Sequence, residues 1–295
     1  MNPIIKWYGG KTRLLDSIKA LLPADVYVGK IQRYIEPFLG GASVFTDLFD
    51  IFAQSVEKFY INDSNYDLMD MYYIVAIQPT AVIEHLDVLQ IQYNNAKDRQ
   101  KWFLERRAEY NECKKNVYPG VMAHNSLYYR IRKTALFIAI NKTCFNGLYR
   151  LNSKGELNVS NGTLSDKQLF IPEDIEQLSA MLWESKLDSI DFMETFQYIT
   201  PRSFIFLDPP YLPITNKSKT NYGFNNFDEL DHKRVALYFR KADRLGAKVI
   251  LCSSDVPIIR ELYHDYDIFP CKIFRSSGGQ NESRRYITEL IITNH

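Results

Sequence analysis

The chain has 295 residues, 46% of them hydrophobic and 24% charged, and this balance excludes an intrinsically disordered chain or a fibrous repeat. Its formal net charge of +1, taken alone, disfavours a nucleic-acid partner. There is no apolar stretch of about 18 residues, the length typical of a membrane span, and the first residues lack the apolar core of a signal peptide. We therefore expect a cytoplasmic protein without membrane contact.

Short apolar runs that end in a polar or turn residue predict buried strands. These runs are 34–37, 59–63, 203–208 and 248–252. Helical patterns lie between them, at 11–22 and 231–245, and this alternation predicts an open α/β sheet. Ligands of such sheets sit beyond the carboxyl ends of the strands, where residues 37–41, Asp63 and residues 208–211 fall.

The near-zero net charge hides two regions of opposite sign. Between Lys97 and Lys154 there are thirteen Lys or Arg against four Asp or Glu, a balance of +9, while the remainder carries −8. Residues 66–162 have helical, polar and basic patterns, and we interpret them as an insertion into one domain made of residues 1–65 and 163–295. The basic run fits a phosphate-facing surface, and it fits a solvated helical face as well.

The first motif, at 6–12, is Lys-Trp-Tyr-Gly-Gly-Lys-Thr. Its Gly-Lys-Thr ending suggests a phosphate loop, but that loop requires a glycine where Ile5 stands, which argues against nucleoside triphosphate binding. A Trp and a Lys around two flexible glycines at a helix start can bind a carboxylate. A loop that merely packs fits the motif equally well.

The second motif, at 36–43, is Glu-Pro-Phe-Leu-Gly-Gly-Ala-Ser, a glycine-rich turn between a strand and a helix. Such a turn lets a ligand approach the backbone, and Asp63 at the next strand end can accept hydrogen bonds from ribose hydroxyls. A turn glycine and a helix-capping Asp are also ordinary structural devices.

The third motif is Asp208-Pro209-Pro210-Tyr211. Two prolines hold the Asp carboxylate, the Pro209 carbonyl and the Tyr ring in one rigid arrangement. Two acceptors beside a stacking ring suit a planar base that carries an exocyclic amino group.

These motifs together resemble the Dam-like DNA adenine methyltransferases, which depend on S-adenosylmethionine. The matching segments follow the family's order along nearly the whole chain, at 6–11, 36–45, 62–63, 141–150 and 208–211. The resemblance implies a Rossmann-like mixed seven-stranded methyltransferase sheet with helices on both faces. It also implies an inserted helical DNA-recognition domain, 66–162, that contains a β-hairpin.

The resemblance assigns the cofactor S-adenosylmethionine to one set of residues and catalysis to another. The cofactor-binding residues would be Trp7, Lys11, Phe38, Gly40, Gly41, Asp63, Asp191, Phe192 and Asp208. In catalysis, Tyr211 would stack on a flipped adenine, while Asp208 and the carbonyl of Pro209, made rigid by Pro210, accept hydrogen bonds from its amino group. No metal is implied, and the four cysteines are spaced too widely for a metal or redox motif.

The resemblance also implies a DNA-reading hairpin at 141–162, which would enter the major groove of double-stranded DNA. Arg150 would donate two parallel hydrogen bonds to a guanine. The other DNA-binding residues would be Lys6, Phe145, Asn146 and Leu148. The Arg and Lys residues of 97–133 would chiefly hold phosphates, and the loop 275–285 either approaches DNA or forms a plain surface hairpin.

The expected reaction is transfer of a methyl group to the exocyclic amino group of adenine in double-stranded DNA, with GATC as the default site. The expected role is host DNA methylation or restriction-modification, in which a restriction endonuclease acts on the same site without stable contact. We expect a monomer. The alternatives are a non-catalytic DNA-binding module with a methyltransferase fold, or methylation of RNA or of a protein glutamine.

Overall fold

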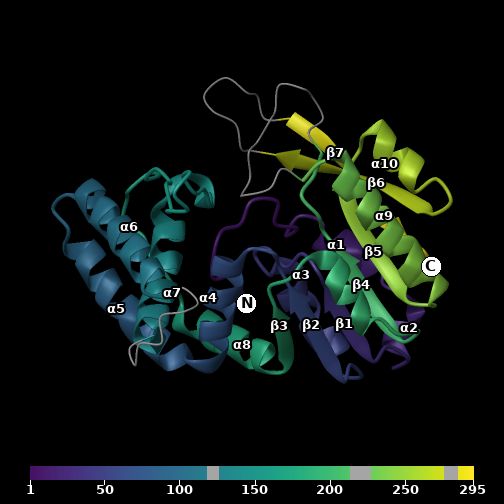
Figure 1. Cartoon of the computed structure of the whole chain (residues 1–295), viewed down its shortest axis with the longest axis horizontal. Coiled ribbons are helices and arrows are strands. Elements are labelled where there is room, and N and C mark those ends of the chain that lie inside the picture. The colour runs from purple at the N-terminus through teal and green to yellow at the C-terminus, as the bar shows by residue number, and fades with distance from the viewer. Residues whose placement is uncertain (118–125, 213–226, 276–284) are drawn as a thin grey trace.

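The computed structural model describes residues 1–117, 126–212, 227–275 and 285–295 (Figure 1). Within these residues, seven strands form one sheet in the order β3-β2-β1-β4-β5-β7-β6. The strands are β1 (Arg33–Glu36), β2 (Lys58–Asn62), β3 (Ser185–Asp188), β4 (Ser203–Leu207), β5 (Lys248–Ser254), β6 (Asp267–Arg275) and β7 (Arg285–Thr293). The first five strands are parallel, and β7 lies antiparallel between β5 and β6. The predicted mixed seven-stranded sheet is confirmed.

The sheet reverses its winding direction at β1. This strand pairs with β2 on one side and β4 on the other, so that Ile35 lies opposite both Tyr60 and Ile205. At such a point, the loops that follow two neighbouring strands run to opposite faces of the sheet. This leaves a crevice beyond the carboxyl ends of the two strands. The loops that follow β1, β2 and β4 therefore lie where a ligand of this fold is bound.

Helices cover both faces of the sheet, because alternate residues of each strand point to opposite sides. Tyr34 and Phe204 pack in the same buried cluster as Phe45 of α3 (Ser43–Phe52). Their strand neighbours Ile35 and Ile205 pack on the other face, in the cluster that contains α9 (Glu229–Arg244) and α10 (Pro257–Leu262). The strands are therefore apolar on both sides, as expected for the interior of a parallel sheet.

Local capping explains where several helices begin. Asp228 accepts hydrogen bonds from the backbone of Leu230 and Asp231 and starts α9, which confirms the helix predicted at 231–245. The helix predicted at 11–22 is shorter, because the structure forms turns up to α1 (Leu15–Ala20). A four-residue helix, α2 (Ala24–Tyr27), follows it.

A group of helices lies beside the sheet, at the left of Figure 1. It comprises α4 (Tyr66–Ile77), α5 (Pro79–Asn95), α6 (Arg99–Lys115) and α7 (Ser126–Thr143). Helices α5 and α6 pack on α7, whereas α4 contacts both α7 and α8 (Pro172–Trp183), and also β3. Helix α4 thus joins α5, α6 and α7 to the sheet, and the insertion of residues 66–162 as a second domain stays a prediction.

The segment 141–162 differs from the predicted β-hairpin. Asn141 to Thr143 form the last turn of α7, and a short 3-10 helix, η1 (Phe145–Gly147), follows. The chain then folds back through two isolated antiparallel bridges, Cys144 with Asn161 and Leu151 with Leu157. It is therefore a folded-back loop without regular strands, since each pairing stops after one residue pair.

Two further observations complete the fold. Cys113, Cys144, Cys252 and Cys271 form no disulfide bond. Among the described residues no single helix is long and apolar enough to cross a bilayer; only α4 and α5 taken together would be, and these two meet at a bend of 110°.

Candidate active site

Three strand ends place carboxylates at one edge of the sheet. Glu36 ends β1, Asp63 follows β2, and Asp208 follows β4. Lys11, from the N-terminal loop, reaches this edge and forms an ion pair of 2.7 Å between its Nζ and Oδ2 of Asp208. The same amine donates to the carbonyl of Gly9 at 2.6 Å. The first and third motifs, about two hundred residues apart in the sequence, therefore meet through one buried contact.

The ammonium of Lys11 stays charged although its side chain is only 4% exposed. Burial favours the neutral amine, but the carboxylates of Asp208 and Glu289 and the thiol of Cys252 outweigh it, and the pKa of Lys11 is raised. The ammonium also lies 4.6 Å from the centroid of the Tyr211 ring. Lys11 thus holds the acidic side chain and the aromatic ring of the tetrapeptide in place.

The glycine-rich turn after β1 is held by Asp63 and covered by Trp7. Oδ2 of Asp63 accepts a hydrogen bond from the backbone of Gly40 at 2.9 Å. Gly40 has a φ of +50°, and a Cβ there would lie 2.9 Å from the indole ring of Trp7. A Cβ at Gly41 would lie 2.8 Å from the Cβ of Trp7. Only glycine fits at both positions, so the first two motifs build one surface.

Asp191 and Phe192 reach the same region through a different strand. The rings of Phe38 and Phe192 lie 5.0 Å apart, which brings the turn after β1 next to the turn after β3. The carboxylate of Asp191 caps η2 (Phe192–Tyr198) and pairs with Arg234 at 2.7 Å. Its cofactor role stays a prediction, because these two contacts already explain its position.

Asn62 fastens these turns together, a role that the sequence motifs did not assign to it. Its amide nitrogen donates to the carbonyls of Pro37 and Ile190, at 3.0 and 3.2 Å. Its amide oxygen accepts from the backbone of Ile190 at 3.0 Å. The buried amide therefore links the ends of β1, β2 and β3.

The tetrapeptide is anchored on both sides. The phenol of Tyr211 donates to Glu289 of β7 at 3.0 Å, and burial together with the nearby carboxylates raises the pKa of Tyr211 well above its usual value. The carbonyl of Pro210 accepts a hydrogen bond of 3.1 Å from Nε2 of His232 on α9. Burial lowers the pKa of His232 to about 4, so the ring is neutral and carries its proton on Nε2. Pro209 lies buried between Asp208 and this anchor.

Sequence reasoning missed three of these residues: Glu36, Glu289 and His232. Glu36 is 2% exposed, and burial and the charges of Asp208 and Asp63 raise its pKa well above the usual value, against the opposing effect of a hydrogen bond from Tyr34. The signal available was a lone acidic residue inside an apolar run, as in Ile-Thr-Glu-Leu-Ile-Ile around Glu289. His232 carried no such signal, because a polar residue on an amphipathic helix is ordinary.

The recognition segment, residues 141–162, is joined to the N-terminal loop by Asn141. The amide oxygen of Asn141 accepts from the backbone of Lys6 at 2.7 Å, while its nitrogen donates to the carbonyls of Lys6 and Gly147 at 2.8 and 3.2 Å. The backbone at Gly147 approaches the backbone at Lys6 so closely that a Cβ on Gly147 would lie 2.4 Å from the Cβ of Lys6. Residues predicted from two separate motifs to contact DNA are thus neighbours.

The other predicted DNA-binding residues lie along this segment. Phe145 is 51% exposed, and Asn146 adopts a left-handed backbone with a φ of +53°. Leu148 is half-buried and packs against the core. Arg150 is exposed, and its Nε donates to the carbonyl of Asn158 at 2.9 Å, which fixes the direction of the guanidinium.

Much of the basic run at 97–133 does not face phosphate, contrary to the sequence-based expectation. Many of its charges are neutralised by acidic side chains of the protein. Lys114 and Lys133 pair with Asp67, Arg130 and Lys133 with Asp70, and Arg106 and Arg132 with Glu109, while Arg99 pairs at the surface with Asp166. The sequence could not show this, because most of the acidic partners lie outside the run. Of the loop at 275–285, residues 276–284 lie outside the described part of the chain.

Comparison with known proteins gives a consistent result. Residues 7–276 match the model of the D12 class N6 adenine-specific DNA methyltransferases. The chain is 33% identical to the type II methyltransferase M.MjaIII of Methanocaldococcus jannaschii, over 100% of this chain and 99% of that protein. It is 28% identical to the DNA adenine methylase of Haemophilus influenzae, over 98% and 92% of the two chains. A DNA adenine methylase of Vibrio cholerae is 27% identical over 97% and 94%.

Proposed function

Because the chain belongs to the D12 class N6 adenine-specific DNA methyltransferases, we propose that it methylates the exocyclic amino group of adenine at a specific site in double-stranded DNA, after flipping the base. The observation that carries the proposal is the buried ion pair of Lys11 with Asp208, since it joins the predicted cofactor loop to the predicted catalytic tetrapeptide.

The residues at the strand ends suit S-adenosylmethionine, the donor that the family implies. A sulfonium and an ammonium make this molecule cationic, and the carboxylates of Glu36, Asp63 and Asp208 lie close enough to influence one another. When bound, S-adenosylmethionine supplies a methyl group activated by its positively charged sulfur. Asp63 is the residue for ribose hydroxyls, and Trp7 with the Gly40 turn forms the wall beside it.

The tetrapeptide residues position the target amino group. Asp208 is paired with Lys11, and the oxygens of its carboxylate accept hydrogen bonds, so the amino group of adenine would donate to it and to the carbonyl of Pro209. The ring of Tyr211, fixed through its phenol by Glu289, provides the stacking surface for the flipped base. Positioning of this kind supplies much of the rate enhancement when the donor is already reactive.

The recognition segment and Lys6 would read the bases around the adenine. The exposed ring of Phe145 and the amide of Asn146 would enter the space that the flipped base leaves, with Leu148 beside them. The site itself, for which GATC is our default, is proposed from the resemblance in sequence. Restriction-modification, with an endonuclease that acts on the same site, is the favoured role, and the cytoplasm is the favoured location because the substrate is cellular DNA.

The test is transfer of a labelled methyl group to adenine. We expect wild-type protein to label duplex DNA and the Asp208→Ala variant to lose at least about three orders of magnitude in kcat, with folding and DNA retention intact. Asp265→Ala removes a carboxylate that is 77% exposed and serves as the control, expected to be fully active. Unchanged kcat in Asp208→Ala would refute the mechanism, and labelling of RNA or a protein glutamine in place of duplex DNA would refute the substrate.

A further inference from the structure

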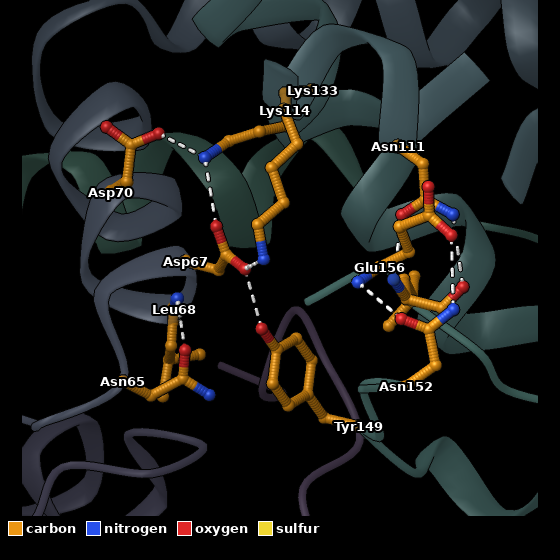
Figure 2. Close-up of polar contacts among 11 residues, drawn as sticks. Asn65, Asp67, Leu68, Asp70, Asn111, Lys114, Lys133, Tyr149, Asn152 and Glu156 are labelled. Atoms are coloured by element: carbon orange, nitrogen blue, oxygen red, sulfur yellow. Dashed lines mark hydrogen bonds and ion pairs between the residues drawn. The ribbon is translucent and has the colours of Figure 1, made fainter. Parts of the chain in front are cut away.

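Tyr149, the residue that precedes Arg150, is held by three contacts from different parts of the fold. Its phenol donates to Oδ2 of Asp67 at 2.6 Å (Figure 2). Its ring centroid lies 5.9 Å from that of Trp7 in the N-terminal loop and 5.9 Å from that of Phe137 on α7. The sequence motifs gave Tyr149 no role of its own.

The acceptor of this hydrogen bond is fixed and charged. Asp67 is 5% exposed and forms ion pairs with Lys114 of α6 at 2.6 Å and with Lys133 of α7 at 3.3 Å. Burial would raise the pKa of Asp67, but the two lysines and the phenol outweigh it, and the pKa is lowered. A hydrogen bond to a charged group is roughly twice as strong as one between neutral groups.

Lys133 of α7 also pairs with a second acidic residue of α4. Its side chain is 2% exposed and pairs with Asp70 at 2.8 Å, one turn along α4 from Asp67. Asn65 caps the same helix by accepting from the backbone of Leu68, as Figure 2 shows. Tyr149 is thus bonded to α4, a helix that several other contacts already hold in position.

The returning part of the recognition segment is fixed to the same helices. Asn111 of α6 accepts from the backbone of Leu157 at 2.7 Å and donates to its carbonyl at 3.2 Å. Asn152 closes the tip by bonding to Glu156 (Figure 2). Arg150 thus lies between two anchored residues, Tyr149 and Asn152. Its own backbone carbonyl accepts a hydrogen bond from the backbone of Asn158 at 2.8 Å.

We propose that Tyr149 is a specificity-determining positioning residue, whose hydrogen bond to Asp67 sets the backbone from which Arg150 meets one base pair. The inference rests on the proposed function and deepens it. Two parallel hydrogen bonds to a base require close alignment, and a correct pair of this kind discriminates between bases by roughly 5- to 150-fold. Loss of the anchor lets the guanidinium sample neighbouring positions, and discrimination falls before the reaction at the correct site does.

The test compares discrimination in Tyr149→Phe with that of wild type. Sequencing of DNA methylated by wild type defines the cognate site, and kcat/KM is then measured on it and on duplexes that carry one substituted base pair. In Tyr149→Phe, which keeps the ring, we expect the ratio between these kcat/KM values at the base pair read by Arg150 to fall about tenfold. The cognate kcat and the KM for S-adenosylmethionine should stay within about twofold of wild type. Arg150→Ala marks complete loss of discrimination at that pair.

Tyr93→Phe is the matched control. Its phenol also makes one hydrogen bond from a buried ring in the inserted helices, to the carbonyl of Ser165 at 2.8 Å, but not to the recognition segment. Tyr93→Phe should discriminate as wild type does. Asp67→Asn provides a second approach, because a double variant with Tyr149→Phe should discriminate no worse than Asp67→Asn alone.

An unchanged ratio in Tyr149→Phe, or an equal loss in Tyr93→Phe, overturns the inference and leaves the proposed function standing. A wild-type protein that methylates no adenine in duplex DNA overturns the proposed function and this inference with it.

Discussion

The residues of the candidate site differ in how clearly the sequence around them indicates a functional role. Lys11 and Asp208 lie in short motifs with unusual composition, and the structure brings them together at 2.7 Å. Glu289 is marked in the sequence only as a lone acidic residue in an apolar run, His232 lies in a helix of ordinary composition, and only the folded chain carries them to Tyr211 and Pro210. Nothing in the sequence around either residue indicates which distant residue it contacts, so these pairs could not be read from the sequence.

At the residue scale, His232 should make stability depend on pH. Its pKa is lowered to about 4, below the ordinary value of 6.5, so between these values the unfolded chain binds a proton that the folded chain does not. The contribution of His232 to the free energy of unfolding is therefore full above pH 6.5 and is lost as the pH falls towards 4. From pH 7 to pH 5 the loss should be about 2 kcal/mol.

Denaturant unfolding of wild type and His232→Gln across this range measures that loss. The difference between the two proteins should shrink as the pH falls, because the variant has no imidazole to protonate. His264→Gln, at a position that is 72% exposed, controls for removal of a histidine. Parallel pH curves for wild type and His232→Gln would contradict the prediction.

At the scale of elements, α4 connects the sheet to the inserted helices. It begins two residues after Asp63 with the cap residue Asn65, and it carries Asp67 and Asp70, which neutralise cations of α6 and α7. The helix patterns of the sequence were sufficient to predict that the chain between Tyr66 and Thr143 is largely helical. They did not predict the role of α4, because ion pairs between helices depend on which faces meet.

The ion pairs change what a lysine of α6 is expected to do. The side chain of Lys114 is 11% exposed and is bonded to Asp67, so Lys114→Ala should lower the free energy of unfolding by about 2 kcal/mol. Lys101→Ala, at an exposed position on the same helix, should leave it unchanged within about 0.5 kcal/mol. Thermal or denaturant unfolding checks both variants, and equal stability of the two would show that Lys114 does not hold this network together.

At the scale of the whole molecule, the apolar runs were sufficient to predict four strands of the sheet, because burial on both faces requires continuous apolar strands, whereas the number of seven strands was implied by the resemblance. The strands predicted at 34–37, 59–63, 203–208 and 248–252 match β1, β2, β4 and β5 within two residues at either end. Strand β3 was missed because its sequence, Ser-Lys-Leu-Asp, is polar at an edge of the sheet. The sequence does contain a basic region and an acidic remainder. In the folded protein, however, much of the basic run forms ion pairs with acidic side chains of the same chain.

The residues proposed to bind the cofactor come from loops around one sheet, so a ligand there should stabilise the molecule as a whole. S-adenosylhomocysteine at a hundred times its Kd should raise the free energy of unfolding by about 2.7 kcal/mol, and Tm by roughly 5 to 10 °C. Asp63→Asn should lose most of this gain, because its carboxylate holds the Gly40 turn and is the proposed acceptor for the ribose hydroxyls. Calorimetry and thermal unfolding measure the two effects, and no binding by wild type would favour the non-catalytic module.

The three hydrogen bonds of Asn141 determine which segments have to be exchanged together if target preference is to be transferred from one relative to another. Because they join Lys6 to Gly147, the unit that can be exchanged is discontinuous and includes both the N-terminal loop and the recognition segment. A chimera that receives only residues 144–162 would place a foreign segment against the native Lys6, where even one added Cβ at Gly147 has no room. Exchange of sequence preference therefore calls for two grafts made together.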